Sequence, residues 1–254
     1  MISKISKGTV MDQIYLPKIR PPGFFIGDYV EISPTRMKKT TFYTHNMPHL
    51  EPIKDLIREE IFKYFDAADN VIITGSFLEK GVHFNDIDII VIGMIAADKT
   101  WENYFEQRLG LKVHFICIDR KSLQQGSRQD PLFQMMLSKY LAKKREMFSF
   151  KNEYKYKILD LHLLKSKSFL DNFDMLTGRE KYNLVRNMCA IRLFLQGKVL
   201  DLEVVNTEID KIFGKLAVMR LKENMVEKKI FCSKFRKIYD ETFKSIMKHA
   251  PQQK

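Results

Sequence analysis

The chain has 254 residues, of which 45% are hydrophobic and 29% are charged, and its formal net charge is +12. This length suffices for one large domain or for two small ones with separate hydrophobic cores. No apolar run approaches the length of a membrane span, and the first residues lack the hydrophobic core of a signal peptide. We therefore expect a globular protein that does not associate with a membrane.

The cysteines indicate a reducing compartment. Cys117, Cys189 and Cys232 are odd in number, far apart in the chain and set among apolar residues. This pattern is typical of reduced core residues rather than of a disulfide framework, so we expect a cytoplasmic protein. The spacing of cysteine and histidine that marks a metal site is absent from the sequence.

The first 50 residues form an arm in which several prolines and glycines disfavour a helix. Residues 24–26 and 29–32 are apolar and aromatic, which is compatible with short strands or with a segment that wraps around the domain. After this arm, Glu51 to Phe65 has apolar residues at helical spacing, which predicts a helix that packs one face against a sheet.

The stretch from Val71 to Gly93 predicts two buried strands separated by a break at Gly75-Ser76. The second strand begins with Asp86-Ile87-Asp88. Side chains two residues apart on a strand point to the same face, so we expect the two carboxylates to lie side by side. Adjacent carboxylates on a buried strand repel each other, and a divalent cation is the usual compensation. Oxygen ligands favour Mg²⁺, which takes its other ligands from water and phosphate.

Gly75-Ser76 has the chemistry of a phosphate-binding turn. Glycine lets the backbone approach a phosphate closely, and serine offers a hydroxyl and an N–H group. If a helix starts at this point, its N-terminal N–H groups also favour an anion. The stretch thus predicts a phosphate contact at Gly75 and Ser76 beside a metal contact at Asp86 and Asp88.

At these residues the chain resembles the nucleotidyltransferase superfamily that includes DNA polymerase beta and the minimal nucleotidyltransferases. The signature of that family is an apolar residue, Gly-Ser or Gly-Gly, a short spacer, and Asp-apolar-Asp or Asp-apolar-Glu. Gly75-Ser76 and Asp86-Ile87-Asp88 match it, and Gly81 lies where many members carry a glycine. The match covers about residues 50–120. It implies a small mixed sheet, a nucleoside triphosphate such as ATP as substrate, and Mg²⁺ as one or two ions.

The family usually supplies a third carboxylate from a later strand, and the chain departs from it there. A helix is predicted over Lys99 to Leu109 and a strand over Lys112 to Ile118. The residue that aligns with the third carboxylate is His114. It is either a metal or phosphate contact or what is left after a catalytic base was lost, and Asp119 or Glu79 are other acids that could serve.

The second half predicts a helical bundle that follows a single boundary. The polar stretch from Gln124 to Pro131 is interpreted as that boundary, so we expect an arm and nucleotidyltransferase-like domain over residues 1–125 and a bundle over 126–254. The fold class is thus α+β, a small mixed sheet with flanking helices followed by an α-helical bundle. The predicted helices are Pro131–Arg145, Lys155–Asn172, Thr177–Gln196, Val204–Phe213 and Leu216–His249.

Charge differs between the two halves. Residues 51–120 contain 8 basic and 13 acidic residues, and residues 121–254 contain 28 and 15. A basic surface beside an acidic metal site suits a polyanion such as a nucleoside triphosphate or RNA. The alternative is that lysine-rich helices are only solvated.

Three functions remain open from the sequence. The leading hypothesis is a metal-dependent nucleotidyltransferase that moves a nucleoside monophosphate from a nucleoside triphosphate to an RNA, protein or small-molecule acceptor. The second is a catalytically degraded module with the same fold that binds nucleotide or RNA. The third is an antitoxin-like partner protein.

Overall fold

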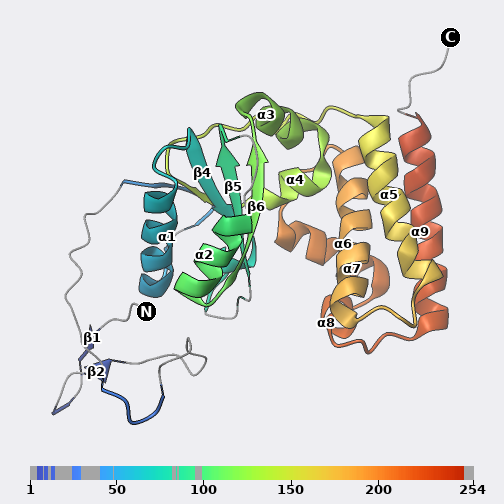
Figure 1. The fold of residues 1–254 in the computed structure, drawn as a ribbon. Helices are drawn as coiled ribbons and strands as arrows, with labels where there is room; N and C mark the ends of the chain where they lie inside the picture. The colour runs from blue at the N-terminus through green and yellow to red at the C-terminus, as the bar shows by residue number, and fades with distance from the viewer. Residues whose placement is uncertain are drawn as a thin grey trace. The chain divides into compact units, whose positions relative to one another are not determined.

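The computed structural model describes residues 5–7, 9–10, 13–14, 25–29, 41–47, 49–81, 84, 86–94 and 99–248. The chain divides into two compact units (Figure 1). The sheet unit comprises Met1–Arg120 and Lys139–Glu146, and the helical unit comprises Lys121–Ser138 and Met147–Lys254. The expected α+β class is confirmed in its coarse form, as a mixed sheet together with many helices. No helix in the described part of the chain is long and apolar enough to cross a membrane.

The sheet unit is built on a five-stranded mixed sheet with the strand order β3-β7-β4-β5-β6. β4 runs antiparallel to β5 and to β7, β7 runs antiparallel to β3, and β5 runs parallel to β6. The strands are β3 (Tyr43–His45), β4 (Asn70–Thr74), β5 (Asp86–Ile92), β6 (Lys112–Ile118) and β7 (Tyr140–Ala142). A separate pair, β1 (Ile5–Ser6) and β2 (Gln13–Ile14), lies in the N-terminal arm.

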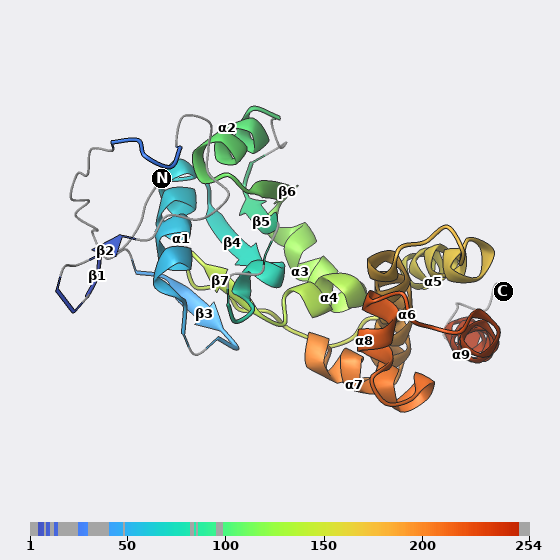
Figure 2. The ribbon, with the colours of Figure 1, turned by 90° about the horizontal axis from the view of Figure 1, so that it is seen from below.

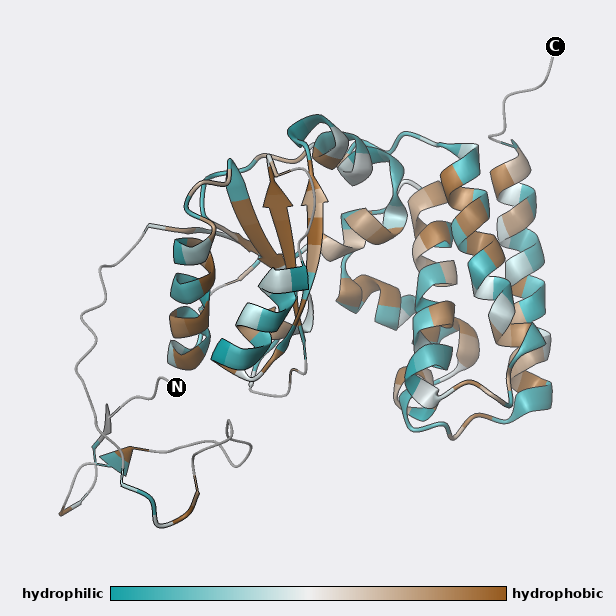
Figure 3. Ribbon diagram, in the orientation of Figure 1, coloured by the Kyte–Doolittle hydropathy of each residue, from teal (hydrophilic) through white to brown (hydrophobic). Residues whose placement is uncertain are grey.

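Two helices, α1 (Pro52–Tyr64) and α2 (Lys99–Leu109), lie on one face of this sheet (Figure 1). Their aromatic and aliphatic side chains pack with alternate residues of β4, β5 and β6, which Figure 3 shows as hydrophobic strands. A buried strand sends every second side chain to this face. The expected order of helix, strand, turn, strand, helix, strand is confirmed. The core includes Ile61, Phe65, Val71, Ile73, Ile87, Ile89, Val91 and Phe105.

Residues 131–145 do not form the helix that their sequence predicts. α4 (Pro131–Met136) stops early, and the chain returns to the sheet unit as β7. Leu141 pairs with Ile73 of β4 and is fully buried, so this segment belongs to the hydrophobic core of the sheet unit. Short apolar runs are ambiguous between the two states. The single boundary expected at residues 125 and 126 therefore differs from the observed division.

The polar stretch interpreted as a break is mostly helical. α3 spans Arg120–Gln129, with Leu123 and Ser127 buried on one side. Asp130 ends it and caps α4, since its side chain accepts hydrogen bonds from the N–H groups of Leu132 and Phe133. Polar residues lower helix propensity only slightly, and one buried stripe is enough to keep the helix.

The helical unit contains α5 (Tyr156–Asp171), α6 (Gly178–Leu195), α7 (Leu202–Phe213), α8 (Ala217–Lys222) and α9 (Lys228–Lys248). The capping box expected in front of α6 is present, since Thr177 and Glu180 each bond the other's backbone N–H. α5, α6 and α9 surround one apolar core that includes Leu163, Phe169, Met188, Phe194 and Phe235. Cys189 belongs to this core, and burial raises the pKa of its thiol.

The long helix predicted over residues 216–249 is two helices. Asn224 has a φ of 60°, its N–H bonds Leu221 O at 3.0 Å, and the N–H of Met225 bonds Arg220 O at 2.7 Å. This pair of bonds is a Schellman motif, which ends α8. Asparagine tolerates the left-handed conformation, so Asn224 is the signal that the periodicity alone did not reveal.

Part of the N-terminal prediction lies outside the described residues, namely Phe24 and residues 30–32. The described residues 25–29 form a turn rather than a strand, and Ile26 and Tyr29 are exposed.

Candidate functional site

The motif residues gather at one edge of the sheet, where β4 ends and where β5 and β6 begin. Asp88 lies opposite Thr74 of β4 and opposite His114 of β6, and Asp86 lies opposite Lys112. Neighbouring residues of paired strands point to the same face, so these side chains form a polar edge on the face that does not carry α1 and α2.

Asp86 and Asp88 are the exception to an otherwise buried strand. Both are half-buried, whereas Ile87 and Ile89 to Ile92 are buried. Ser76 Oγ lies 3.4 Å from Asp86 Oδ1, and His114 Nδ1 lies 3.4 Å from Asp88 Oδ1. The His114 side chain is 59% exposed and that of Asp88 is 35% exposed. His114 therefore lies beside Asp88.

Gly75 is held against Asp88. Its φ is +80°, a backbone conformation that residues other than glycine rarely adopt. A Cβ atom at this position would overlap Asp88 Oδ2. Any other residue would therefore strain the turn and displace the carboxylate. This close approach explains why glycine, rather than serine or alanine, stands directly after β4.

The turn at Gly75–Leu78 is a single turn of 3₁₀ helix, η1. It is too short to supply the aligned dipoles that favour an anion at a helix N-terminus. The phosphate contact expected here therefore depends on the hydroxyl and backbone N–H of Ser76. Phe77 and Leu78 are buried and fix this turn to the core.

A buried lysine holds the loop that connects the two halves of the motif. The Lys54 side chain of α1 is fully buried, pairs with Glu51 Oε2 at 3.0 Å and donates a hydrogen bond to the Glu79 carbonyl. Its ammonium group also lies 5.8 Å and 5.5 Å from the ring centroids of Phe77 and Phe84. Helical periodicity at residues 51–65 counts Lys54 as a surface residue, so sequence reasoning missed this contact.

Glu51 completes this tether, which we call the Lys54 clamp (Lys54, Glu51, Glu79 and Gly81). Its carboxylate accepts the N–H of Gly81 at 2.9 Å. This backbone hydrogen bond, followed by the hydrogen bond from Lys54, lowers the pKa of Glu51 to about 2. The loop is thus fixed to the start of α1 at two of its residues.

Of the other acids considered for the third position, Glu79 has another partner and Asp119 lies at the far end of the sheet. Glu79 is held by Lys139 Nζ at 2.9 Å. Asp119 follows Ile118, which pairs with Ile92 at the opposite end of β5 from Asp86. The register therefore leaves His114 as the side chain of β6 nearest to Asp88.

The carboxylates of Asp86 and Asp88 suit a metal ion that takes most of its ligands from water and substrate. Within the described residues, no group of three or more His, Cys, Asp and Glu side chains is arranged to hold a metal ion. Mg²⁺ is commonly bound by one or two carboxylates together with water and substrate phosphate. Asp86 and Asp88 fit that pattern. They do not form a closed structural metal site.

One buried group near this edge has no partner. The Oγ1 atom of Thr74, opposite Asp88, is buried and makes no hydrogen bond with a described residue. A lone buried hydroxyl costs free energy, and such groups often lie at functional sites.

Comparison with known proteins adds no relative to these observations. No family model, curated protein or solved structure matches the chain.

Proposed function

We propose that the sheet unit is a metal-dependent nucleotidyltransferase that transfers a nucleoside monophosphate from a nucleoside triphosphate to an acceptor. The observation that carries this proposal is the meeting of Gly75-Ser76 with Asp86 and Asp88 at one sheet edge. The Gly75-Ser76 turn and the pair of half-buried carboxylates approach each other to 3.4 Å there, at Ser76 Oγ and Asp86 Oδ1.

Each residue has a distinct role in this proposal. In the Gly75-Ser76 turn, the Ser76 hydroxyl and backbone N–H would bind the β- and γ-phosphates, and Gly75 lets the turn pack closely against Asp88. Asp86 and Asp88 would hold Mg²⁺, which neutralises phosphate charge and supports the leaving group. The acceptor hydroxyl would lose its proton to solvent and its oxygen would form a bond to the α-phosphorus, while the bond from that phosphorus to the bridging β-phosphate oxygen breaks and pyrophosphate leaves.

A specific observation favours a second candidate. The β6 side chain beside Asp88 is the imidazole of His114 rather than a carboxylate. A second metal ion near the acceptor would then lack an acidic ligand. The same edge could in that case bind a triphosphate and its metal without transfer, as a nucleotide-binding module.

The experiment is label transfer from each of the four α-³²P nucleoside triphosphates, with Mg²⁺ or Mn²⁺, to the protein itself, lysate proteins and bulk RNA. The Asp86→Asn/Asp88→Asn variant tests the site. The Glu102→Gln/Glu106→Gln variant is the matched control, because it removes two exposed carboxylates from α2 of the same unit.

Label transferred by the wild type and the control but not by the Asp86/Asp88 variant supports the enzyme and identifies the acceptor class. Absence of transfer, together with metal-dependent triphosphate binding by calorimetry that the same variant loses, supports the binding module. Absence of both transfer and triphosphate binding contradicts both candidates.

A further inference from the structure

The imidazole of His114 lies beside one particular oxygen of Asp88. Its Nδ1 atom is 3.4 Å from Asp88 Oδ1. The other oxygen, Oδ2, lies so close to Gly75 that a Cβ atom there would overlap it. The turn therefore occupies the Oδ2 side of the carboxylate, and Oδ1 faces β6, the last strand of the sheet (Figure 2).

The spacing of these two atoms fits a shared metal ion better than a hydrogen bond. A well-formed N–H···O hydrogen bond is about 2.7–3.2 Å long. Two ligand atoms that each lie about 2.1 Å from one ion are about 3.4 Å apart at the tetrahedral angle. The His114 side chain is 59% exposed and that of Asp88 is 35% exposed, so an ion can reach both atoms from solvent.

A buried hydroxyl without a partner lies on the other side of Asp88. Thr74 pairs with Asp88 across β4 and β5, so the two side chains point to the same face of the sheet. Thr74 is fully buried, and its Oγ1 makes no hydrogen bond with a described residue. A water molecule bound to an ion at Asp88 would give this hydroxyl a partner. The unpaired hydroxyl is thus independent support for a ligand at this edge.

The chemistry of His114 decides which ion suits this position. Mg²⁺ takes oxygen ligands and gives up its bound water reluctantly. An imidazole nitrogen instead suits transition-metal ions such as Zn²⁺, and affinity for nitrogen and oxygen sites rises from Mn²⁺ through Co²⁺ and Ni²⁺. A carboxylate beside an imidazole is a mixed pair of this second kind.

We propose that Asp88 and His114 together bind a divalent transition-metal ion, with His114 Nδ1 as the nitrogen ligand and as the group that selects this ion over Mg²⁺. The ion takes the second position of the proposed reaction, on the β6 side, where the register places an imidazole instead of a carboxylate. The inference rests on the metal contact of the proposed function at Asp88, and not on transfer. Water and phosphate complete the coordination, because two protein ligands do not close a site.

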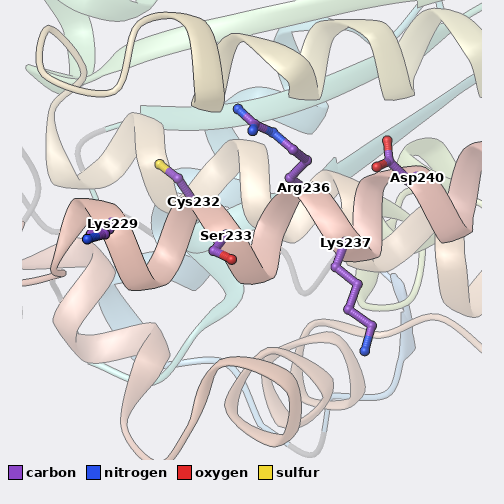
Figure 4. Close-up of a pocket in the computed structure, with 6 residues that line it drawn as sticks. All are labelled: Lys229, Cys232, Ser233, Arg236, Lys237 and Asp240. Atoms are coloured by element: carbon purple, nitrogen blue, oxygen red, sulfur yellow. The ribbon is translucent and has the colours of Figure 1, made fainter.

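A second group of side chains with metal-binding chemistry lies on α9. Cys232 and Asp240 line one groove, and Figure 4 shows Arg236 between them. They are eight residues apart in sequence. Eight residues rise about 12 Å along a helix, so one ion cannot contact both side chains. The guanidinium of Arg236 also repels a cation. The Cys232 thiol is nevertheless a place where a transition-metal ion binds adventitiously, so the experiment includes a control for it.

The experiment measures the binding of Co²⁺ and of Mg²⁺ to the full chain by calorimetry, without triphosphate. His114→Gln tests the site. His49→Gln is the matched control, because His49 is an exposed histidine of the same unit. Cys232→Ser removes the thiol of α9. Circular dichroism and thermal unfolding establish that the variants are folded.

We expect His114→Gln to bind Co²⁺ at least about tenfold more weakly than the wild type. It should bind Mg²⁺ like the wild type, because Mg²⁺ does not use the imidazole. His114→Asp should bind Mg²⁺ more tightly, since it supplies an oxygen ligand. His49→Gln and Cys232→Ser should bind both ions unchanged. Equal losses of Co²⁺ and Mg²⁺ in His114→Gln would mean that His114 only supports the shape of the edge and would overturn the proposal, as would unchanged Co²⁺ binding.

The visible absorption of bound Co²⁺ gives a readout that a structural role of His114 would not change. The spectrum of Co²⁺ depends on its ligands, so the bound ion should differ from Co²⁺ in water. The difference should disappear in His114→Gln and in Asp88→Asn and should persist in His49→Gln. Zn²⁺ should displace the signal. A spectrum that depends on Cys232 but not on His114 would mean an adventitious ion only and would overturn the proposal.

The failure of this inference and the failure of the proposed function give different results. Label transfer that Mg²⁺ alone supports and that His114→Gln leaves unchanged would keep the nucleotidyltransferase and overturn the transition-metal ion. Binding of Co²⁺ that depends on His114, without transfer in the presence of any ion, supports the inference and leaves the nucleotide-binding module as the function of the edge.

Discussion

Two helices of this protein, α1 of the sheet unit and α9 of the helical unit, use basic residues in different ways. In the sheet unit, Lys54 and Arg58 of α1 have almost no exposed side-chain surface, and each pairs with a carboxylate and lies over aromatic rings. In the helical unit, Lys234, Lys237, Lys244 and Lys248 of α9 are exposed and form no ion pair with a described residue. The first arrangement fixes backbone, whereas the second creates a field that reaches into solvent.

This difference separates two kinds of consequence. Removing a buried, paired cation leaves its partners unsatisfied and lowers the free energy of unfolding. Removing an exposed, unpaired lysine changes stability little and changes the binding of a polyanion. The formal net charge of +12 does not distinguish buried, paired cations from exposed, unpaired ones.

The largest effect should come from the acidic edge itself. Asp86→Asn/Asp88→Asn should lower transfer at least a thousandfold, since both metal contacts are lost. The free energy of unfolding should stay the same or rise, because the substitution removes repulsion between neighbouring carboxylates. Label transfer and urea unfolding followed by the fluorescence of Trp101 measure the two quantities. Trp101 is the single tryptophan of the chain and lies on α2, so it reports on the sheet unit.

Unchanged transfer by this variant would show that the acidic edge is not the reaction site. A large drop in the urea midpoint would show instead that the carboxylates have a structural role. Glu102→Gln/Glu106→Gln should change neither quantity.

The next effect should come from the Lys54 clamp. Lys54→Ala should lower the free energy of unfolding of the sheet unit by about 2–3 kcal/mol, at the low end for a buried pair because Glu51 is partly exposed. Lys54→Met keeps most of the volume and should cost less, which separates packing from charge. Urea unfolding followed by Trp101 fluorescence measures the change.

Lys63→Ala is the matched control for the clamp, because Lys63 is an exposed lysine of the same helix. Its effect should stay within about 0.5 kcal/mol. Equal effects of Lys54→Ala and Lys63→Ala would mean that Lys54 does not hold the loop.

Gly75 gives a smaller effect that tests the contact with Asp88. Gly110 has a similar positive φ of +69° but open space around it, whereas a Cβ at Gly75 would overlap Asp88. Gly110→Ala should therefore cost about 1 kcal/mol from backbone strain alone, and Gly75→Ala about 2 kcal/mol. Urea unfolding gives both values, and transfer should fall only in Gly75→Ala. Equal costs and unchanged transfer would contradict the close approach.

The sequence predicted most of the elements that build the edge and fewer of those that support it. β4, β5, β6, α1 and α2 follow from strong periodicity, and the Asp86-Ile87-Asp88 pattern places two carboxylates on one face. β7 was missed because three residues of a central strand carry no periodicity that separates them from a helix. The Lys54 clamp was missed for another reason. A lysine on a helix is buried only by tertiary contacts, here with Glu79 and two rings, which no local pattern contains.

Acid should release the clamp at Glu51, with the smallest of these effects. The pKa of Glu51 is lowered from 4.5 to about 2 in the folded protein, mainly by the Gly81 N–H. A carboxyl with a lowered folded pKa contributes stability that is complete above about pH 4.5 and is lost as the pH falls toward 2. The urea midpoint reported by Trp101 should therefore fall between pH 5 and 2.5, and the fall should be shallower in Glu51→Gln.

Glu180→Gln is the comparison from the helical unit, where the capping-box hydrogen bonds from Thr177 lower the pKa of Glu180. It should leave the Trp101 transition unchanged and alter only the far-ultraviolet circular dichroism transition of the helices. An identical acid response in wild type and Glu51→Gln would mean that the hydrogen bond from Gly81 does not contribute to the stability of the sheet unit.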